Sequence, residues 1–200
     1  MDCQNYQGIS LLSVPGKVYA KVLNERVKRI ISGRIMELQG GFREGRSCID
    51  QIFTLKQLME KMIEKNKKMY VAFVDLEKAY DTMSRKKLWR VLEGYNICGK
   101  LLTGIKALYE GSQACVRVES RVSQWFEIRQ GVRQGCVLSP VLFNIFMDKV
   151  MREAMESWRG GVQMLNTQAK GLLFADDVAV TAEKEEDLQQ NLEALDRSLQ

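Results

Sequence analysis

The apolar residues of this chain follow two patterns, a helical spacing over long segments and short continuous runs between them. The helical spacing predicts helices over residues 13–33, 49–64, 85–95, 99–109, 139–158 and 183–200. The short runs predict strands at residues 70–74, 114–118, 125–128, 172–174 and 178–180. Ser13 and Pro15 suit a capped first turn, and Gly33 suits the end of that helix. With no repeat, linker or low-complexity segment, the pattern predicts one compact unit.

Acidic residues stand at the ends of the predicted strands. The run at residues 70–74 ends at Asp75, and Asp176 and Asp177 separate the last two runs. The second arrangement predicts a tight hairpin with both carboxylates at its turn. A further hairpin is predicted around residues 119–121, between the two middle runs.

The composition excludes several kinds of chemistry. The chain has 200 residues, 46% of them hydrophobic and 28% charged, which is enough to bury a sizeable core. It contains no histidine, which removes histidine-based triads and histidine-ligated metals. The five cysteines lie 17 or more residues apart, so neither a zinc ribbon nor a disulfide framework is expected. Catalysis would have to depend on carboxylates, Lys or Arg side chains, hydroxyls or a lone thiol.

Charge is distributed unevenly around a net value of +5. Residues 1–150 carry 25 Lys and Arg against 15 Asp and Glu, whereas residues 151–200 carry 5 against 10. One interpretation is a solvated surface with an acidic last helix. The other is a basic body that binds a polyanion, with carboxylates gathered elsewhere. No signal peptide is visible and no apolar run approaches the roughly 20 residues of a membrane span, so a soluble, intracellular protein without a membrane partner is expected.

The carboxylates suggest a metal site. Acidic groups beside buried strands are costly unless a cation compensates them, and Mg²⁺ prefers carboxylate and phosphate oxygens. If the strands that carry Asp75 and Asp176 are neighbours, three carboxylates with Asp177 converge on one sheet edge. Such a set suits two Mg²⁺ ions that activate a hydroxyl and stabilise a leaving pyrophosphate. The alternative is that Asp75 caps the next segment and the Asp pair makes a polar turn.

The residues after Asp75 have features that suit a nucleotide. Backbone N–H groups between Leu76 and Ala79 could face a triphosphate. Tyr80 could pack under a sugar and exclude a 2′-hydroxyl, although an ordinary core aromatic gives the same spacing.

Glycine-bearing loops supply further candidates. Gln134 beside Gly135 combines an amide with a backbone that a base or sugar can approach closely. Guanidinium groups in these loops could reach phosphates or could simply be solvated. The arginines concerned are Arg43, Arg46, Arg129 and Arg133.

Five motifs in order resemble one known family. The segments 73–81 (FVDLEKAYD), 131–140 (GVRQGCVLSP) and 174–177 (FADD) look like successive core motifs of a reverse transcriptase. The segments 5–12 (NYQGISLL) and 40–46 (GGFREGR) look like its fingers motifs. The resemblance runs from about residue 5 to residue 200, and its style is that of non-LTR (LINE-type) retrotransposons.

The resemblance implies an α+β fold, the right-hand polymerase palm with part of the fingers. Residues 1–70 would be partial fingers and residues 71–200 the palm, interleaved with fingers helices around residues 85–110; the thumb would lie beyond Gln200. The implied activity is RNA-directed DNA synthesis with two Mg²⁺ ions, or Mn²⁺, on an RNA template, a DNA primer and dNTP, in the nucleus or a cytoplasmic ribonucleoprotein.

By position, the resemblance gives each candidate residue a role. Asp75 and Asp176 would ligate the metals, and Asp177 would complete the acidic cluster. Tyr80 would be the steric gate, with Leu76 and Ala79 beside the nucleotide. Gln134 and Gly135 would line the nucleotide and template groove, while the basic fingers surface, with Arg43, Arg46 and Arg133 as candidates, would hold nucleic acid through phosphates.

Gln7 departs from the family, which usually has an arginine there to grip the triphosphate. A glutamine supplies no positive charge, so weaker nucleotide capture is expected. Two alternatives to a polymerase therefore stay open. One is a catalytically inactive or co-opted retrotransposon remnant that keeps the palm and binds RNA. The other is a different two-metal palm enzyme, such as a nucleotide cyclase, which the fingers motifs disfavour.

Overall fold

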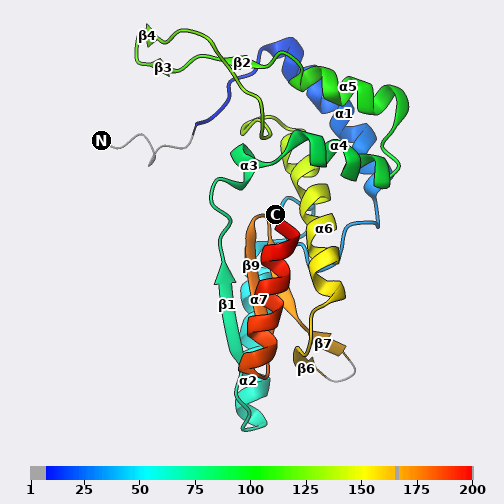
Figure 1. The fold of residues 1–200 in the computed structure, drawn as a ribbon, viewed down its shortest axis with the longest axis vertical. Coiled ribbons are helices and arrows are strands. Elements are labelled where there is room, and N and C mark those ends of the chain that lie inside the picture. Colours follow the sequence, from blue (N-terminus) through cyan, green and yellow to red (C-terminus); the bar gives the residue numbers. More distant parts are fainter. Residues whose placement is uncertain (1–7, 165–166, 200) are drawn as a thin grey trace. The chain divides into compact units, whose positions relative to one another are not determined.

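The fold was obtained as a computed structural model that describes residues 8–164 and 167–199 (Figure 1). The chain forms two compact units, each assembled from two separate segments. The first unit comprises residues 1–32 and 78–143, and the second comprises residues 33–77 and 144–200. The expectation of one compact unit was therefore wrong. The division into fingers and palm at residue 70 that the resemblance implied stays a prediction.

The first unit is mainly helical. Its elements are α1 (Val14–Ile31), α3 (Ala79–Thr82), α4 (Arg85–Gly94), α5 (Gly99–Tyr109), β2 (Gln113–Ala114), β3 (Arg117–Val118), β4 (Arg121–Val122), β5 (Phe126–Glu127) and the first turn of α6 (Ser139–Glu156). α5 packs against both α1 and α4, and Leu23, Leu92 and Ile105 are buried. None of the helices in the described segments is both long and apolar enough to span a membrane.

The local signals for the first unit were largely confirmed. Ser13 is the N-cap of α1, and its hydroxyl accepts a hydrogen bond from Gly16 N at 3.3 Å. The predicted hairpin around residues 119–121 forms, but as two separate two-residue ladders, β2 with β5 and β3 with β4. The α3 turn was not predicted, because four residues are too few to show a helical period.

The second unit is built on an antiparallel sheet. β1 (Tyr70–Val74), β9 (Asp177–Ala182) and β8 (Gly171–Phe174) lie in the order β1–β9–β8. α7 (Glu185–Leu199) packs on β1 and β9, as Figure 1 shows. Val178, Val180 and Leu173 meet Met151 of α6 and Leu195 of α7 in one apolar cluster. α6 and α7 therefore cover one face of the sheet, whereas on the opposite face α2 contacts β8 and Phe73 of β1 is exposed.

A smaller cluster completes this unit. α2 (Cys48–Glu64) packs Leu58 and Met62 against Val162 of β6 (Val162–Met164), which pairs with β7 (Thr167–Ala169). Ser47 and Asp50 form a capping box at the start of α2. The β6–β7 hairpin was missed in the sequence, because its strands are three residues long and partly polar.

Glu183 joins this hairpin to the end of α2, which gives a pH-dependent prediction. Its carboxylate accepts hydrogen bonds from Gln163 N at 3.0 Å and from Lys67 Nζ at 2.9 Å. The bond from the Gln163 backbone, followed by that from Lys67, lowers the pKa of Glu183 below its usual 4.5. A depressed pKa stabilises the fold above the unfolded-state pKa, and this contribution is lost as the pH falls through the folded-state pKa.

We therefore expect Glu183→Gln to lower the free energy of unfolding at pH 7 by about 1 kcal/mol, at the low end for a charged hydrogen bond because the site is partly exposed. At pH 3 or below, the variant and the wild type should converge. Urea unfolding at both pH values measures the difference, and Glu193→Gln on the exposed face of α7 is the control, with little effect at either pH. An equal loss at both pH values would contradict the prediction.

Candidate active site

The sheet of the second unit brings two of the predicted carboxylates to the same end. β1 and β9 pair with Val74 opposite Val178, so the register continued by one residue sets Asp75 opposite Asp177. Val74 and Val178 belong to the core, whereas the side chain of Phe73 is 76% exposed. Because side chains alternate between the faces of a strand, Asp75 and Asp177 share the open face. The two strands are therefore neighbours, as the magnesium hypothesis requires.

Asp176 lies in the turn between β8 and β9. Phe174 pairs with Asp177, so the turn consists of Ala175 and Asp176 alone. The prediction that both carboxylates lie at the turn was wrong for Asp177, because so tight a turn leaves it as the first residue of β9. Ala175 has a φ of 58°, a conformation that favours glycine and costs a residue with a Cβ. Contacts from outside the turn are needed to hold it there.

The three carboxylates at this end of the sheet carry like charges that repel one another. Asp177 is exposed, yet nearby protein atoms remove part of the hydration of its carboxylate, and this desolvation is the main cause that raises its pKa. The negative charges of Asp176 and Asp75 raise this pKa further. Within residues 8–164 and 167–199, none of the three carboxylates forms an ion pair. The cluster thus has the charge and the oxygen donors that suit a divalent cation.

The side chains do not converge on a single point in this structure. Among the described residues, no group of three Asp, Glu or Cys side chains is gathered closely enough to hold a metal ion. The register fixes the backbone positions of Asp75 and Asp177. The three carboxylates are therefore near one end of the sheet without being gathered around a single point.

A pocket of about 260 Å³ opens beside these carboxylates. Asp75 and Asp177 line it together with Phe73, Gln51 and Ile52. Its walls come from α2 and from the open face of the sheet, so acidic and apolar groups face the same space. The pocket therefore offers both carboxylate oxygens and apolar surface to a ligand.

The first unit carries the other predicted nucleotide residues. Tyr80 stacks on Phe143, with ring centroids 4.6 Å apart and an interplanar angle of 17°. Val132 N donates to Tyr80 O at 2.8 Å, and Gly131 N donates to Met83 O at 2.8 Å. A Cβ on Gly131 would lie 2.6 Å from Asp81 O, so the loop approaches the segment that carries Tyr80 as closely as glycine permits. The structure thus joins Tyr80 to the loop that leads to Gln134.

Arg85 holds this loop in place and was not predicted. Its guanidinium donates to the carbonyls of Gly131, Ile128, Gln130 and Tyr109 at 2.8–3.2 Å. Burial lowers the pKa of its guanidinium. Sequence inspection had no signal for this role, because an arginine at the start of a helix looks like a surface residue.

A pocket of about 280 Å³ lies along the same loop, lined by Asp81, Arg85, Arg133 and Gln134 among others. Arg133 donates to Ser112 Oγ at 2.9 Å and lies over the ring of Tyr109. The side-chain oxygen of Gln134 is buried and has no hydrogen-bond partner in the described part of the chain. Gly135, with a φ of 99°, lets the loop pass close to Ser10 O.

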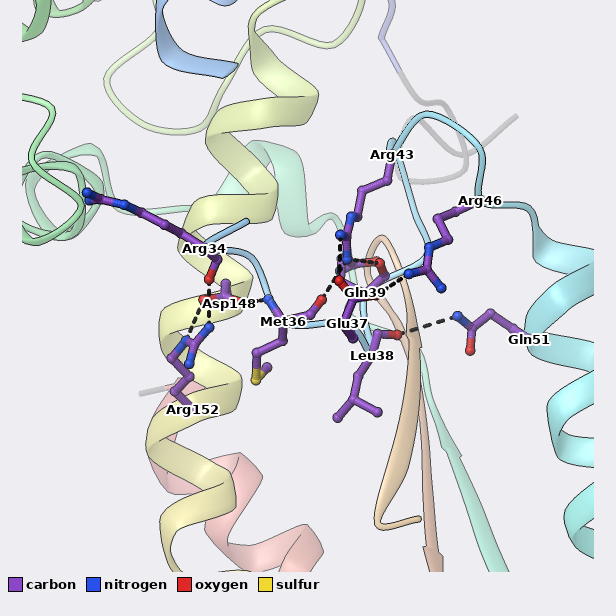
Figure 2. Close-up of polar contacts among 10 residues, drawn as sticks. All are labelled: Arg34, Met36, Glu37, Leu38, Gln39, Arg43, Arg46, Gln51, Asp148 and Arg152. Carbon is purple, nitrogen blue, oxygen red and sulfur yellow. Dashed lines mark hydrogen bonds and ion pairs between the residues drawn. The ribbon is translucent and has the colours of Figure 1, made fainter. Parts of the chain in front are cut away.

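Figure 2 shows that the two predicted arginines of the 40–46 loop have partners within the second unit. Arg43 donates to Met36 O at 2.8 Å and to Gln39 O at 3.1 Å, and it pairs with Glu37. Arg46 also pairs with Glu37, while its side chain stays 40% exposed. Arg43 and Arg46 therefore stabilise the 40–46 loop. Their contact with nucleic acid stays a prediction.

The remaining predictions concern short segments. Lys78 is the N-cap of α3 and has a φ of 49°; Leu76 lies two residues before it, and Ala79 is the first residue of the helix. Asp75 and Leu76 belong to the second unit, and Ala79 belongs to the first. Arg129 is exposed and pairs with Glu127 at 3.1 Å. Gln7, the departure from the family pattern, lies outside the described residues.

Comparisons with known proteins support the resemblance to reverse transcriptases. The sequence model of the family described as reverse transcriptase (RNA-dependent DNA polymerase) matches residues 2–200. Relatives include the Pol polyprotein of the R2 retrotransposable element of Nasonia vitripennis, 28% identical over 200 residues, and a protein of transposon TX1 of Xenopus laevis, 25% identical over 191 residues. The chain is covered by 100% and 93% in these matches, but it spans only 19% and 14% of the relatives.

Solved structures agree. Telomerase from Candida tropicalis, truncated from its C-terminal domain, superposes with a TM-score of 0.60 at 14% identity, over 90% of this chain and 36% of the other. The fold is α+β with antiparallel strands and packed helices, as the resemblance implied. The chain belongs to the reverse transcriptase family. Its relatives are the retrotransposon proteins of non-LTR type that the motifs indicated.

Proposed function

We propose that this chain is the catalytic core of an RNA-directed DNA polymerase that adds deoxynucleotides to a primer 3′-hydroxyl by a two-metal mechanism. The observation that carries the proposal is the β1–β9 register, in which Asp75 stands opposite Asp177 beside the turn that bears Asp176. Desolvation, followed by the negative charges of Asp176 and Asp75, raises the pKa of Asp177, and a cation shared by the three carboxylates would relieve the repulsion among them.

In the proposed reaction, Asp75 and Asp176 hold two Mg²⁺ ions, for which Mn²⁺ can substitute, and Asp177 completes the acidic set. The bound ions would acidify the primer hydroxyl and neutralise the pyrophosphate that leaves. The chain's own residues orient the reactants. Tyr80 would bound the sugar, and Gln134 with Gly135 would line the nucleotide and template groove; the buried Gln134 oxygen, which has no partner in the described residues, supports this role. Leu76 and Ala79 lie on the segment that precedes Tyr80 and would border the nucleotide.

The proposed partners are an RNA template, a DNA primer and dNTP. A telomerase of similar fold has been solved in complex with a fragment of telomeric RNA, which supports an RNA partner for this fold. Arg43, Arg46 and Arg133 are the proposed phosphate contacts. In this proposal, residues 1–70 serve as part of the fingers and residues 71–200 as palm, with residues 85–110 as interleaved fingers helices.

Primer extension on poly(rA)/oligo(dT) with Mg²⁺ tests the proposal, with this chain and with a version continued beyond Gln200 through the expected thumb. We expect extension that EDTA abolishes. RNA binding without extension by either version would instead favour the inactive remnant. Extension that is independent of a divalent cation would contradict the two-metal mechanism.

Tyr80 gives a separate prediction about sugar selectivity. Tyr80→Ala should raise ribonucleotide incorporation relative to deoxyribonucleotide by about 10- to 100-fold, the range in which a pocket wall discriminates one hydroxyl. Tyr80→Phe, which keeps the ring and its stacking on Phe143, should leave the ratio near that of the wild type. Unchanged selectivity in Tyr80→Ala would return Tyr80 to the role of a core aromatic.

A further inference from the structure

Gln39 contacts the turn that carries Asp176 from outside the sheet. Its side chain is buried, with 1% of the residue exposed. Its Nε2 donates to Ala175 O at 3.1 Å, and its Oε1 accepts from Ala175 N at 2.8 Å. The same Oε1 accepts from Gly41 N at 2.8 Å. One amide side chain thus satisfies both backbone groups of the residue that precedes Asp176.

This contact falls on the strained residue of the turn. Ala175 is buried and has the φ of 58° noted above. Its N–H and C=O do not join the β8–β9 ladder, whose last pair is Phe174 with Asp177. Buried backbone groups without a partner are costly, and strained conformations persist only where the surroundings fix them. The Gln39 amide supplies both the partners and the constraint.

The segment that carries Gln39 is itself held firmly. Gly40 N donates to Leu173 O at 2.8 Å and Leu173 N donates to Leu38 O at 3.2 Å, so the segment runs beside β8. Asn144 Nδ2 donates to Gly41 O at 2.8 Å. Figure 2 shows further bonds to the segment from Asp148, which accepts from Met36 N at 2.6 Å, and from Arg43 and Gln51. Gln39 therefore projects from a fixed base rather than from a loose loop.

We propose that Gln39 is a positioning residue for the reaction. Its amide fixes the Ala175 backbone and thereby holds Asp176 and Asp177 in the position from which they share metal ions with Asp75. This inference rests on the proposed polymerase function. It assigns Gln39 no contact with substrate. The competing explanation is an ordinary buried glutamine whose loss lowers stability and nothing else.

The chain offers a matched control for that explanation. Asn191 of α7 is fully buried, and its amide binds both backbone groups of a single residue, Arg159, at 2.8 and 3.0 Å. It is the same kind of contact in the same unit, but it holds the loop after α6 instead of the acidic turn. Gln39→Met and Asn191→Leu each remove one such amide while nearly conserving volume.

The test compares the two variants with the wild type in urea unfolding, Mn²⁺ binding followed by electron paramagnetic resonance, and steady-state primer extension. Both variants should lower the urea midpoint. Only Gln39→Met should weaken Mn²⁺ binding, by roughly 10-fold, as loss of a group that orients metal ligands does. It should also lower kcat by about 100-fold, the effect of an ångström-scale misplacement, with KM for dNTP within about threefold of the wild type.

Equal kcat and Mn²⁺ affinity in Gln39→Met and Asn191→Leu would overturn the inference and leave the proposed function intact. A wild type that neither binds Mn²⁺ nor extends a primer would overturn the proposed function, and the inference with it. If Gln39→Met does not fold, Gln39→Glu keeps the shape and the oxygen that accepts from Ala175 N and Gly41 N. This variant should lose about 10-fold in kcat, because the donor to Ala175 O is gone; wild-type kcat there would equally overturn the inference.

Discussion

Asp75→Asn is expected to lower primer extension on the order of 1,000-fold. The carboxylate that it removes would hold a metal ion contributing several kcal/mol to the transition state, and each 1.36 kcal/mol corresponds to a factor of ten. An asparagine keeps the size of the side chain but removes its charge. The loss should appear in kcat for dNTP incorporation at saturating Mg²⁺.

Stability distinguishes this loss from simple unfolding. Asp75 is exposed and its charge raises the pKa of Asp177, so the two carboxylates destabilise each other in the absence of a cation. Asp75→Asn should therefore unfold at the same or a higher urea concentration than the wild type in EDTA. Glu77→Gln, an exposed carboxylate two residues further along, is the control and should retain near wild-type extension. A variant that is inactive because it is unfolded would not support a metal role.

Gly41→Ala is expected to destabilise the second unit by about 2–3 kcal/mol, the upper range for overpacking in a closely packed site. A Cβ on Gly41 would overlap Ala175 N and would lie 2.8 Å from Ala175 Cα. Both are backbone atoms of the acidic turn, so neither can move aside without moving the turn. We expect primer extension to fall together with stability, because the loop and the turn separate.

The neighbouring glycine is the control for Gly41. A Cβ on Gly40 would lie 2.6 Å from Nε2 of Gln51, the far end of a flexible side chain that can rotate away. Gly40→Ala should therefore cost less than about 1 kcal/mol, as most changes that avoid the backbone do. Urea unfolding of both variants measures the contrast. Equal costs at Gly40 and Gly41 would show that the loop does not press on the turn.

Local signals in the sequence predicted most of the secondary structure. The cap at Ser13, the apolar period of α1 and α2, and the strand that ends at Asp75 were all found where the pattern set them. These features depend on hydrogen bonds between residues a few positions apart and on which face of a helix or strand is apolar. Both can be recognised in a short stretch of sequence. The order of motifs also indicated the family, which the match over residues 2–200 confirmed.

Features that involve distant residues were not predictable in this way. No local pattern indicated that Arg85 would donate hydrogen bonds to carbonyls of the 128–131 loop, such as that of Gly131, 46 residues further along the chain. The division into two units was missed for the same reason. Each depends on packing between segments rather than on periodicity within one.

The acidic site combines features that follow from local sequence with features that depend on tertiary structure. The sequence by itself determined which carboxylates exist and that they adjoin apolar strands, because strand ends and turns follow local pattern. Only the tertiary structure decided that Asp75 stands opposite Asp177, since register is a property of two strands together. Only the tertiary structure likewise brought Gln39 to Ala175, 136 residues further along the chain, because a buried amide finds its backbone partners through the fold and not through its neighbours in sequence.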